Sequence, residues 1–187
     1  MARYKSGIAT QERILESTRG LLGEVGFEST TVKAICERAD IRAGSFYNLF
    51  DSKDQVILTV VREAIQAVDP DPEGVGSDTV GQLAQTYIDF ILNERQMGRV
   101  YLQLALTAGL TDETLRLRML RHHQHRVSRF TDALVREHPE LPADEARTSM
   151  QLLIAGLNGL AYHWVLDPEF DIRSKADILL RERVGIG

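Results

Sequence analysis

The densest run of chemically versatile side chains in this sequence is RHHQHR, at residues 121–126. Imidazole nitrogens are common ligands of Zn²⁺, and they can also transfer protons near neutral pH. On a helix, His122 and His125 share a face, whereas His123 lies about 100° away around the axis. Because no third ligand converges locally, we interpret the run as polar-face histidines between arginines. We expect no metal ion and no cofactor.

Groups that could support catalysis or redox chemistry are sparse elsewhere. The sequence has no glycine-rich phosphate loop and no Ser, His and Asp in the order of a catalytic triad. An activity would need a pocket acid or base such as His123. The single cysteine, Cys36, cannot form an internal disulfide, and we interpret it as core packing, with redox sensing as the alternative. We therefore expect that the chain is not an enzyme.

Composition and charge limit the class of protein further. The 187 residues are 43% hydrophobic, which is enough for a real core, and no run approaches the ~18 apolar residues that span a bilayer. The N-terminal segment lacks the apolar stretch of a signal peptide, so we expect a cytoplasmic protein. The net charge is −5, but residues 1–53 carry eight Lys/Arg and seven Asp/Glu, against fourteen and twenty in the remainder. This asymmetry directs the N-terminal end toward phosphate.

Helical periodicity of apolar residues dominates the chain and predicts an all-α protein of about nine helices. Two short helices follow the first one closely, and each can bury little surface alone, so they must pack on that helix and on each other. This arrangement is the helix-turn-helix pattern. We expect helices at residues 10–24, 32–39, 42–49, 52–68, 79–94, 98–108, 112–137, 143–166 and 172–181.

Local signals place the ends of several of these helices. Gly26 is typical of a helix C-cap, and Thr30 and Thr31 offer hydroxyls that can cap the next helix. Ser52 and Gln55 have capping-box spacing at the start of the fourth helix, which links the two halves of the chain. The proline- and glycine-rich residues 69–78 predict an exposed loop. We expect two domains, a helix-turn-helix domain at 1–53 and a helical domain at 54–187.

The N-terminal third resembles the DNA-binding domain of the TetR/AcrR family. The resemblance rests on Gly26-Phe27, on the segment TTVKAI at 30–35 and on IRAGSFYNLFDSK at 41–53, in order and in register. Tyr47, Phe50 and Ser52-Lys53 match a third-helix Tyr, a Phe three residues on and a Ser-Lys pair that recur in this family. C-terminally the resemblance is only architectural. It implies a homodimeric transcriptional regulator, most simply a repressor that leaves operator double-stranded DNA when a small, largely apolar effector binds.

The resemblance, tested against the chemistry of each side chain, also implies a set of DNA-binding residues. The first turn of the third helix is the part that reaches base edges in a major groove, and Asn48 can pair with adenine or bond to phosphate. Tyr47 and Lys53 can reach backbone phosphates. The full set is Thr31, Lys33, Arg42, Ala43, Gly44, Ser45, Tyr47, Asn48 and Lys53. Taken alone, Tyr47 could equally be a core aromatic, and Lys53 could equally be a solvated surface lysine.

The sequence departs from the family pattern at two positions. Arg42 stands where a capping Ser is usual, which costs the third helix its cap but adds a group that reads guanine or binds phosphate. Leu49 stands where a phosphate-contacting His is common. Arg3 and Lys5, on an N-terminal arm, could compensate by reaching phosphate or the minor groove.

The predicted helix 143–166 is apolar around nearly its whole circumference, so it must be covered on two sides. A strip of mostly small residues on this helix suits close packing against a partner helix, and the last helix would complete a four-helix interface about a two-fold axis, as in the family. The alternative is packing within one chain. The predicted dimer residues are Ala155, Gly156, Gly159, Leu160, His163, Ile178 and Leu179.

The resemblance places an effector pocket among the middle helices of the body. A largely apolar pocket with a few polar groups fits the residues there, although each one could be ordinary core. The expected lining is Tyr87, Phe90, Tyr101, Leu102, Leu106, Met119, His123, Val127 and Asn158. The alternative function for the whole chain is a helical protein-interaction adaptor without specific DNA binding.

Overall fold

The computed structural model describes residues 2–66, 76–111 and 113–185. Within these ranges the chain is helical and contains no strand, which confirms the predicted fold class. The helices are α1 (Ala2–Ser29), α2 (Val32–Arg38), α3 (Ala43–Tyr47), α4 (Lys53–Gln66), α5 (Val80–Asn93), α6 (Arg95–Thr111), α7 (Glu113–Glu137), α8 (Ala143–Leu166) and α9 (Ile172–Val184).

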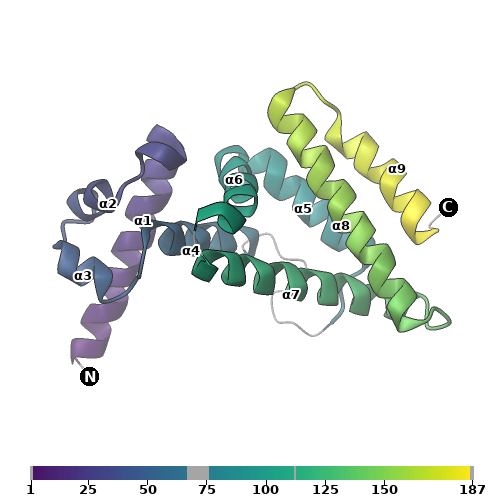
Figure 1. Cartoon of the computed structure of the whole chain (residues 1–187), viewed down its shortest axis with the longest axis horizontal. Helices are drawn as coiled ribbons and strands as arrows, with labels where there is room; N and C mark the ends of the chain where they lie inside the picture. The colour runs from purple at the N-terminus through teal and green to yellow at the C-terminus, as the bar shows by residue number, and fades with distance from the viewer. Residues whose placement is uncertain (1, 67–75, 112, 186–187) are drawn as a thin grey trace.

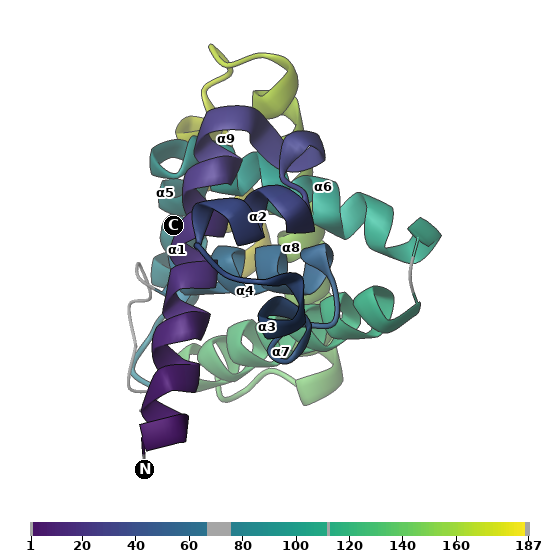
Figure 2. The same ribbon diagram turned by 90° about the vertical axis from the view of Figure 1, so that its left-hand side faces the viewer.

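The helices fall into a small N-terminal cluster and a larger body. Figure 1 shows α1, α2 and α3 at one end of the molecule and the antiparallel pair of α8 and α9 at the other. Helix α4 runs from the cluster into the body and packs on both α1 and α6. The view onto the N-terminal end has α2 and α3 in front of the body, so neither short helix is covered by it (Figure 2).

Both predicted ends of the first helix differ from the structure. Helix α1 begins at Ala2, so Arg3 and Lys5 belong to helical backbone rather than to an irregular arm. Gly26 interrupts this helix with a φ of 77°, but one more turn follows it before Thr30, whose hydroxyl donates to the Gly26 carbonyl at 2.7 Å.

Helix α6 starts at Arg95 rather than at Gly98, because this glycine serves close packing rather than a helix break. A Cβ at Gly98 would lie 3.1 Å from Ile91 Cδ1 and 3.3 Å from Ile91 Cα, where α5 and α6 approach each other. Of the predicted loop at 69–78, only residues 76–78 lie within the described ranges, and they are not helical.

The junction between the cluster and the body is well packed and capped as predicted. Val56, Ile57 and Val60 of α4 are fully buried in one continuous core. Ser52 Oγ accepts a hydrogen bond from the Gln55 N–H at 3.2 Å. A second tie joins α6 to α1, because Gln103 Nε2 donates to Glu28 Oε1 at 2.9 Å. The body therefore holds the cluster through α6 as well as through α4.

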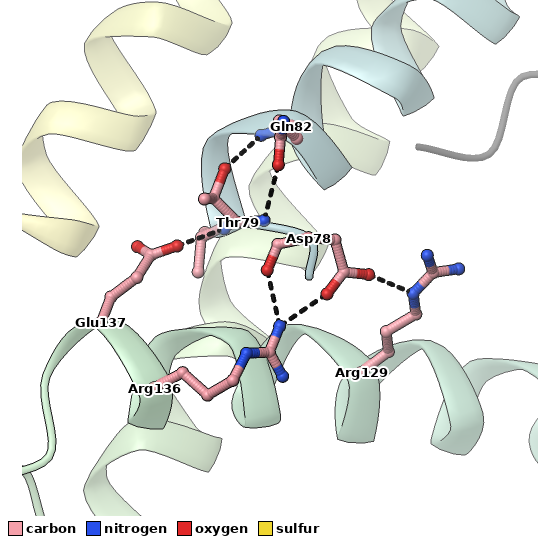
Figure 3. Close-up of polar contacts among 7 residues, drawn as sticks. Asp78, Thr79, Gln82, Arg129, Arg136 and Glu137 are labelled. Carbon is pink, nitrogen blue, oxygen red and sulfur yellow. Dashed lines mark hydrogen bonds and ion pairs between the residues drawn. The ribbon is translucent and has the colours of Figure 1, made fainter. Parts of the chain in front are cut away.

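A buried carboxylate fixes the start of α5 to α7 (Figure 3). Asp78 is 4% exposed and accepts from Arg129 Nε at 2.5 Å and from Arg136 Nη2 at 2.6 Å. Next to Arg136, Glu137 accepts from the Val80 N–H at 2.9 Å. Sequence patterns alone did not predict this network, because its partners lie some 50 residues apart. It locks two of the helices that enclose the body cavity.

A search of the described helices finds none that is long and apolar enough to cross a membrane.

Candidate nucleic-acid interface and body cavity

The predicted DNA-reading turn lies exposed at the start of α3. Arg42, Ala43 and Gly44 are exposed, and Ser45 is half-buried. Arg42 occupies the N-cap position and makes no side-chain capping bond, so its guanidinium is not committed to the helix. A Cβ built at Gly44 meets nothing within 4 Å, so packing within the chain does not require this glycine. The turn can be approached closely by another molecule.

The aromatic run of α3 divides between core and surface. Phe46 and Phe50 are buried, whereas Tyr47 is 57% exposed and packs edge-on against Phe46 with ring centroids 5.4 Å apart. Asn48 is also exposed. Tyr47 therefore is not a core aromatic, and its hydroxyl is available to a partner.

Two predicted contact residues lie around α2. The Thr31 hydroxyl caps α2 by accepting from the Ala34 N–H at 3.1 Å, which leaves its own proton available to a phosphate oxygen. Lys33 is almost fully exposed and lies 3.8 Å from the carboxylate of Glu37, one turn further on. A pair this exposed contributes little to stability, so the Lys33 ammonium remains available to a phosphate.

Lys53 makes two contacts within the chain that the sequence did not predict. Its Nζ donates to the Phe27 carbonyl at 3.1 Å and lies 4.3 Å from the centroid of the Phe27 ring. The side chain therefore joins the start of α4 to the last turn of α1. Leu49 is half-buried against the core, which accounts for an apolar residue at that position.

The position of α2 on α1 depends on a pair that the sequence analysis missed. Arg38 donates to both carboxylate oxygens of Glu24, at 2.6 and 2.8 Å, and this bidentate bond lowers the pKa of Glu24. A Cβ at Gly20 would lie 2.6 Å from Arg38 Nη2, so Gly20 gives the arginine room to cross α1. Arg38 lies 14 residues from Glu24 along the chain, and only the fold brings the two side chains together.

The body contains a cavity of about 190 Å³ among α4, α5, α6 and α7. Its apolar wall includes Leu83, Phe90 and Phe130, and cationic and imidazole groups line the remainder. The complete lining is Arg62, Gln66, Leu83, Thr86, Tyr87, Phe90, Tyr101, His122, His125, Arg126, Arg129 and Phe130.

The structure brings three of the nine predicted ligand residues to this cavity, namely Tyr87, Phe90 and Tyr101. The other six do not line it. Leu106 is 68% exposed, Leu102 is half-buried, and Met119 and Val127 are buried in the surrounding core. The prediction placed them correctly on the middle helices but could not tell which side of each helix faces the cavity.

The histidine that lines the cavity differs from the predicted one by one residue. His122 lines the cavity, whereas His123 is exposed, because successive residues on a helix are rotated by about 100°. Burial, followed by the charges of Arg126 and Arg62, lowers the pKa of His122 to about 4. The imidazole is therefore neutral at pH 7. Among the described residues, no group of three or more His, Cys, Asp or Glu side chains is arranged to hold a metal ion.

Asn158 lies behind the cavity wall and orients one of its cations. Arg126 Nη1 donates to Asn158 Oδ1 at 3.1 Å and to Tyr101 Oη at 3.4 Å. The guanidinium carbon lies 4.1 Å from the centroid of the Tyr87 ring. Periodicity could have indicated Arg126, because it shares a helix face with His122 and Phe130.

The predicted dimer residues divide into two groups. Gly156 is needed within the chain, because a Cβ there would lie 2.6 Å from Leu179 Cδ2 on α9. Leu179 and Leu160 are half-buried against the core of the chain. Ala155, Gly159, His163 and Ile178 are exposed. The alternative of packing within one chain therefore applies to Gly156 and Leu179.

Comparison with known proteins identifies the N-terminal domain. Residues 14–60 match the model of bacterial regulatory proteins of the tetR family. The HTH-type transcriptional repressor KstR of Rhodococcus jostii (strain RHA1) is 30% identical over 59 residues, which are 32% of this chain and 28% of the repressor. Within this chain, the likeness to the tetR family covers residues 14–60. The match to this repressor spans little more than a quarter of its length.

Solved structures share the fold over more than nine tenths of this chain. A transcriptional regulator from Aquifex aeolicus VF5 is 23% identical, with a TM-score of 0.64 over 92% of this chain and 96% of that one. The TetR-family repressor FadR of Thermus thermophilus, solved in complex with lauroyl-CoA, is 19% identical, with a TM-score of 0.67 over 91% of each chain. At these identities the likeness concerns the fold alone.

Proposed function

We propose that this chain is a sequence-specific DNA-binding transcriptional regulator, a repressor that acts in the cytoplasm as a homodimer and leaves its operator when a small molecule binds the body. Residues 1–53 would read DNA, and residues 54–187 would bind the effector and a second copy. The observation that carries the proposal is the exposed first turn of α3 beside Tyr47, within a TetR-type domain.

The contacts with DNA would divide by chemistry. Arg42 can donate to guanine O6 and N7, and Asn48 can pair with adenine, so these residues would determine sequence preference. Tyr47, Thr31 and Lys33 would bond to backbone phosphates and fix the register of the domain on the duplex. Ala43, Gly44 and Ser45 would allow close approach to the base edges.

The partner copy would cover an apolar face of α8 and α9. Leu152, Ala155, Gly159 and Tyr162 follow one another at helical spacing on α8 and are exposed, as is Ile178 on α9. A second copy packed here would present two α3 helices to half-sites about 34–36 Å apart. Sedimentation of the wild type and of Tyr162→Glu tests this: the proposal requires a dimer that the substitution dissociates.

The cavity offers a route from ligand to DNA. Arg62 and Gln66 of α4 line it, and the same helix begins beside the DNA-reading cluster at Lys53. A molecule that shifts α4 by a few ångströms would change the spacing of the two α3 helices and release the operator. The lauroyl-CoA held by the Thermus thermophilus repressor supports a ligand-binding role for a body of this fold.

The second candidate function, an interaction adaptor, differs from the first in a simple test. The purified protein is offered random-sequence duplex DNA, and the retained fraction is sequenced. Enrichment of a palindromic sequence with two half-sites supports the regulator. A protein that retains no sequence above background contradicts it and favours the adaptor.

A further inference from the structure

We propose that the body cavity binds an apolar molecule that carries a carboxylate, held by Arg126 and Tyr87. Among the side chains that the structure describes, two buried polar atoms have no hydrogen-bond partner, and they are Tyr87 Oη and Arg126 Nη2. Both residues line the same cavity. Calling the bound molecule an effector rests on the proposed function, but its chemical class rests on these two atoms.

Both unpartnered groups are hydrogen-bond donors at neutral pH. Burial raises the pKa of the Tyr87 phenol, and the opposing effects of the Arg126 charge and of the close approach of its guanidinium to the phenol are smaller, so the hydroxyl keeps its proton. A guanidinium has donors only and is always charged. A buried donor without an acceptor costs free energy, and a ligand oxygen would remove this cost at both atoms.

Contacts within the chain hold the arginine in place at the cavity wall. Its Nη1 is bonded to Asn158 Oδ1, and its guanidinium carbon lies over the Tyr87 ring, 4.1 Å from the ring centroid. These contacts fix the guanidinium and leave Nη2 as the group without a partner. A carboxylate is planar and carries two acceptor oxygens, which suits one guanidinium nitrogen and one phenol hydroxyl.

The charges of the cavity wall favour an anion over a neutral acceptor. The described lining includes Arg62, Arg126 and Arg129 and contains no Asp or Glu. The charge of Arg129 is paired with the carboxylate of Asp78. The charges of Arg126 and Arg62 have no such carboxylate in the described lining. His122 is neutral at pH 7 because burial lowers its pKa to about 4.

The remaining wall selects the body of the ligand. Leu83, Phe90, Phe130 and the rings of Tyr87 and Tyr101 give an apolar, largely aromatic surface, and the volume of about 190 Å³ suits a small molecule. The predicted occupant is therefore an alkyl or aryl carboxylate rather than a sugar, a nucleotide or an amine.

Calorimetric titration of the full chain with matched probes tests the proposal. Octanoate, octanamide, octylamine and octyl phosphate share one apolar chain, and 2-naphthoate and 2-naphthamide share an aromatic one. We expect at least one carboxylate to bind tenfold or more tightly than each of its counterparts. Equal or tighter binding of the amide, amine or phosphate ester, or no binding of either carboxylate, would overturn the proposal.

Two substitutions separate binding from folding. Tyr87→Phe removes only the unpartnered hydroxyl, so it should weaken carboxylate binding about tenfold and leave resistance to urea equal to that of the wild type or higher. Arg126→Lys keeps the positive charge but removes the planar guanidinium with its several N–H donors, so it should also weaken carboxylate binding. Arg147→Met, an exposed arginine on α8 outside the cavity, is the matched control and should change neither. Unchanged carboxylate affinity in Tyr87→Phe and Arg126→Lys would contradict the assignment.

The two proposals fail separately. A protein that enriches a DNA sequence but binds no carboxylate contradicts only the inference about the cavity. A protein that binds a carboxylate but retains no DNA contradicts only the regulatory function.

Discussion

Arg118 of α7 donates to the carboxylate of Asp51, which precedes α4, with Nη2 and Oδ2 3.0 Å apart. The bond joins the helix that carries Arg126 to the turn between α3 and α4. Together with the bond from Gln103 to Glu28, it gives the body a direct hold on the DNA-reading cluster. A movement of α7 on ligand binding would therefore reach this cluster without passing through the core.

The first prediction concerns this bond. Arg118→Met should leave stability within about 1 kcal/mol, because Asp51 is largely exposed. It should reduce several-fold the loss of operator affinity that a bound carboxylate causes. Fluorescence anisotropy of labelled operator with and without ligand measures this, and Arg116→Met, whose ion pair with Glu113 lies within α7, is the control. Full release by ligand in Arg118→Met would exclude the coupling role.

The second prediction separates positioning from reading at α3. Tyr47→Phe should weaken operator and random DNA about equally, by about 1 kcal/mol, since it removes one hydroxyl bond to phosphate. Arg42→Ala should instead reduce the preference for the selected sequence, by about 1–3 kcal/mol at one base pair. Competition titrations with operator and scrambled duplexes distinguish the two. Arg147→Met, at an exposed arginine of α8 that is assigned neither to DNA nor to the dimer face, should bind DNA as the wild type does.

A third comparison sets Lys53 against Lys33. Lys53→Ala removes the bond to Phe27 and the contact with its ring, so it should lower the free energy of unfolding by about 1–2 kcal/mol and also weaken DNA binding. Lys33→Ala should weaken DNA binding alone, because its ammonium is exposed. Urea unfolding and anisotropy on both variants measure the difference. Equal stability of the two variants would show that Lys53 does not clamp α1 to α4.

Asp78→Asn provides a fourth test, of the network that frames the cavity. The substitution leaves Arg129 and Arg136 without their carboxylate and should cost about 2–3 kcal/mol of unfolding free energy. Asp89→Asn, which breaks a more exposed pair with Arg173, should cost less than about 1 kcal/mol. Urea midpoints at constant m-value test the contrast, and similar losses in both would contradict it.

The fifth prediction is a dependence of stability on pH. The pKa of His122 is about 4 in the folded chain, below its ordinary 6.5, so between these values the unfolded state takes up a proton that the folded state does not. The free energy of unfolding should therefore fall by about 2 kcal/mol from pH 7 to pH 5 through this residue. His122→Phe should flatten that part of the urea stability profile. A profile of unchanged slope in the variant would argue against a buried neutral imidazole.

Much of the fold could be predicted from the sequence, because its signals are local. Helix α8 begins and ends at the predicted residues, and Ser52 caps the following helix through Gln55 as its spacing indicates. Gly26 and Gly98 mark where such signals mislead. One glycine kinks a helix that continues, and the other allows two helices to approach.

The sites were less predictable, since they depend on contacts between distant residues. The exposed turn at Arg42 could be located from its order in the chain. Predicting the cavity lining requires knowing which side of α7 faces inward, because this decides that His122 and Arg126 line the cavity and His123 does not. The same difficulty applies to Gly156, which was predicted to face a second copy but packs against Leu179 of its own chain.

Titration of the selected operator at several salt concentrations tests the central claim most directly. For a dimer that reads DNA through α3 and neutralises phosphates, log affinity should fall linearly with log salt concentration, and the selected duplex should bind about 10³-fold or more tightly than a scrambled one. Equal affinity for both duplexes, or affinity that salt does not change, would contradict it.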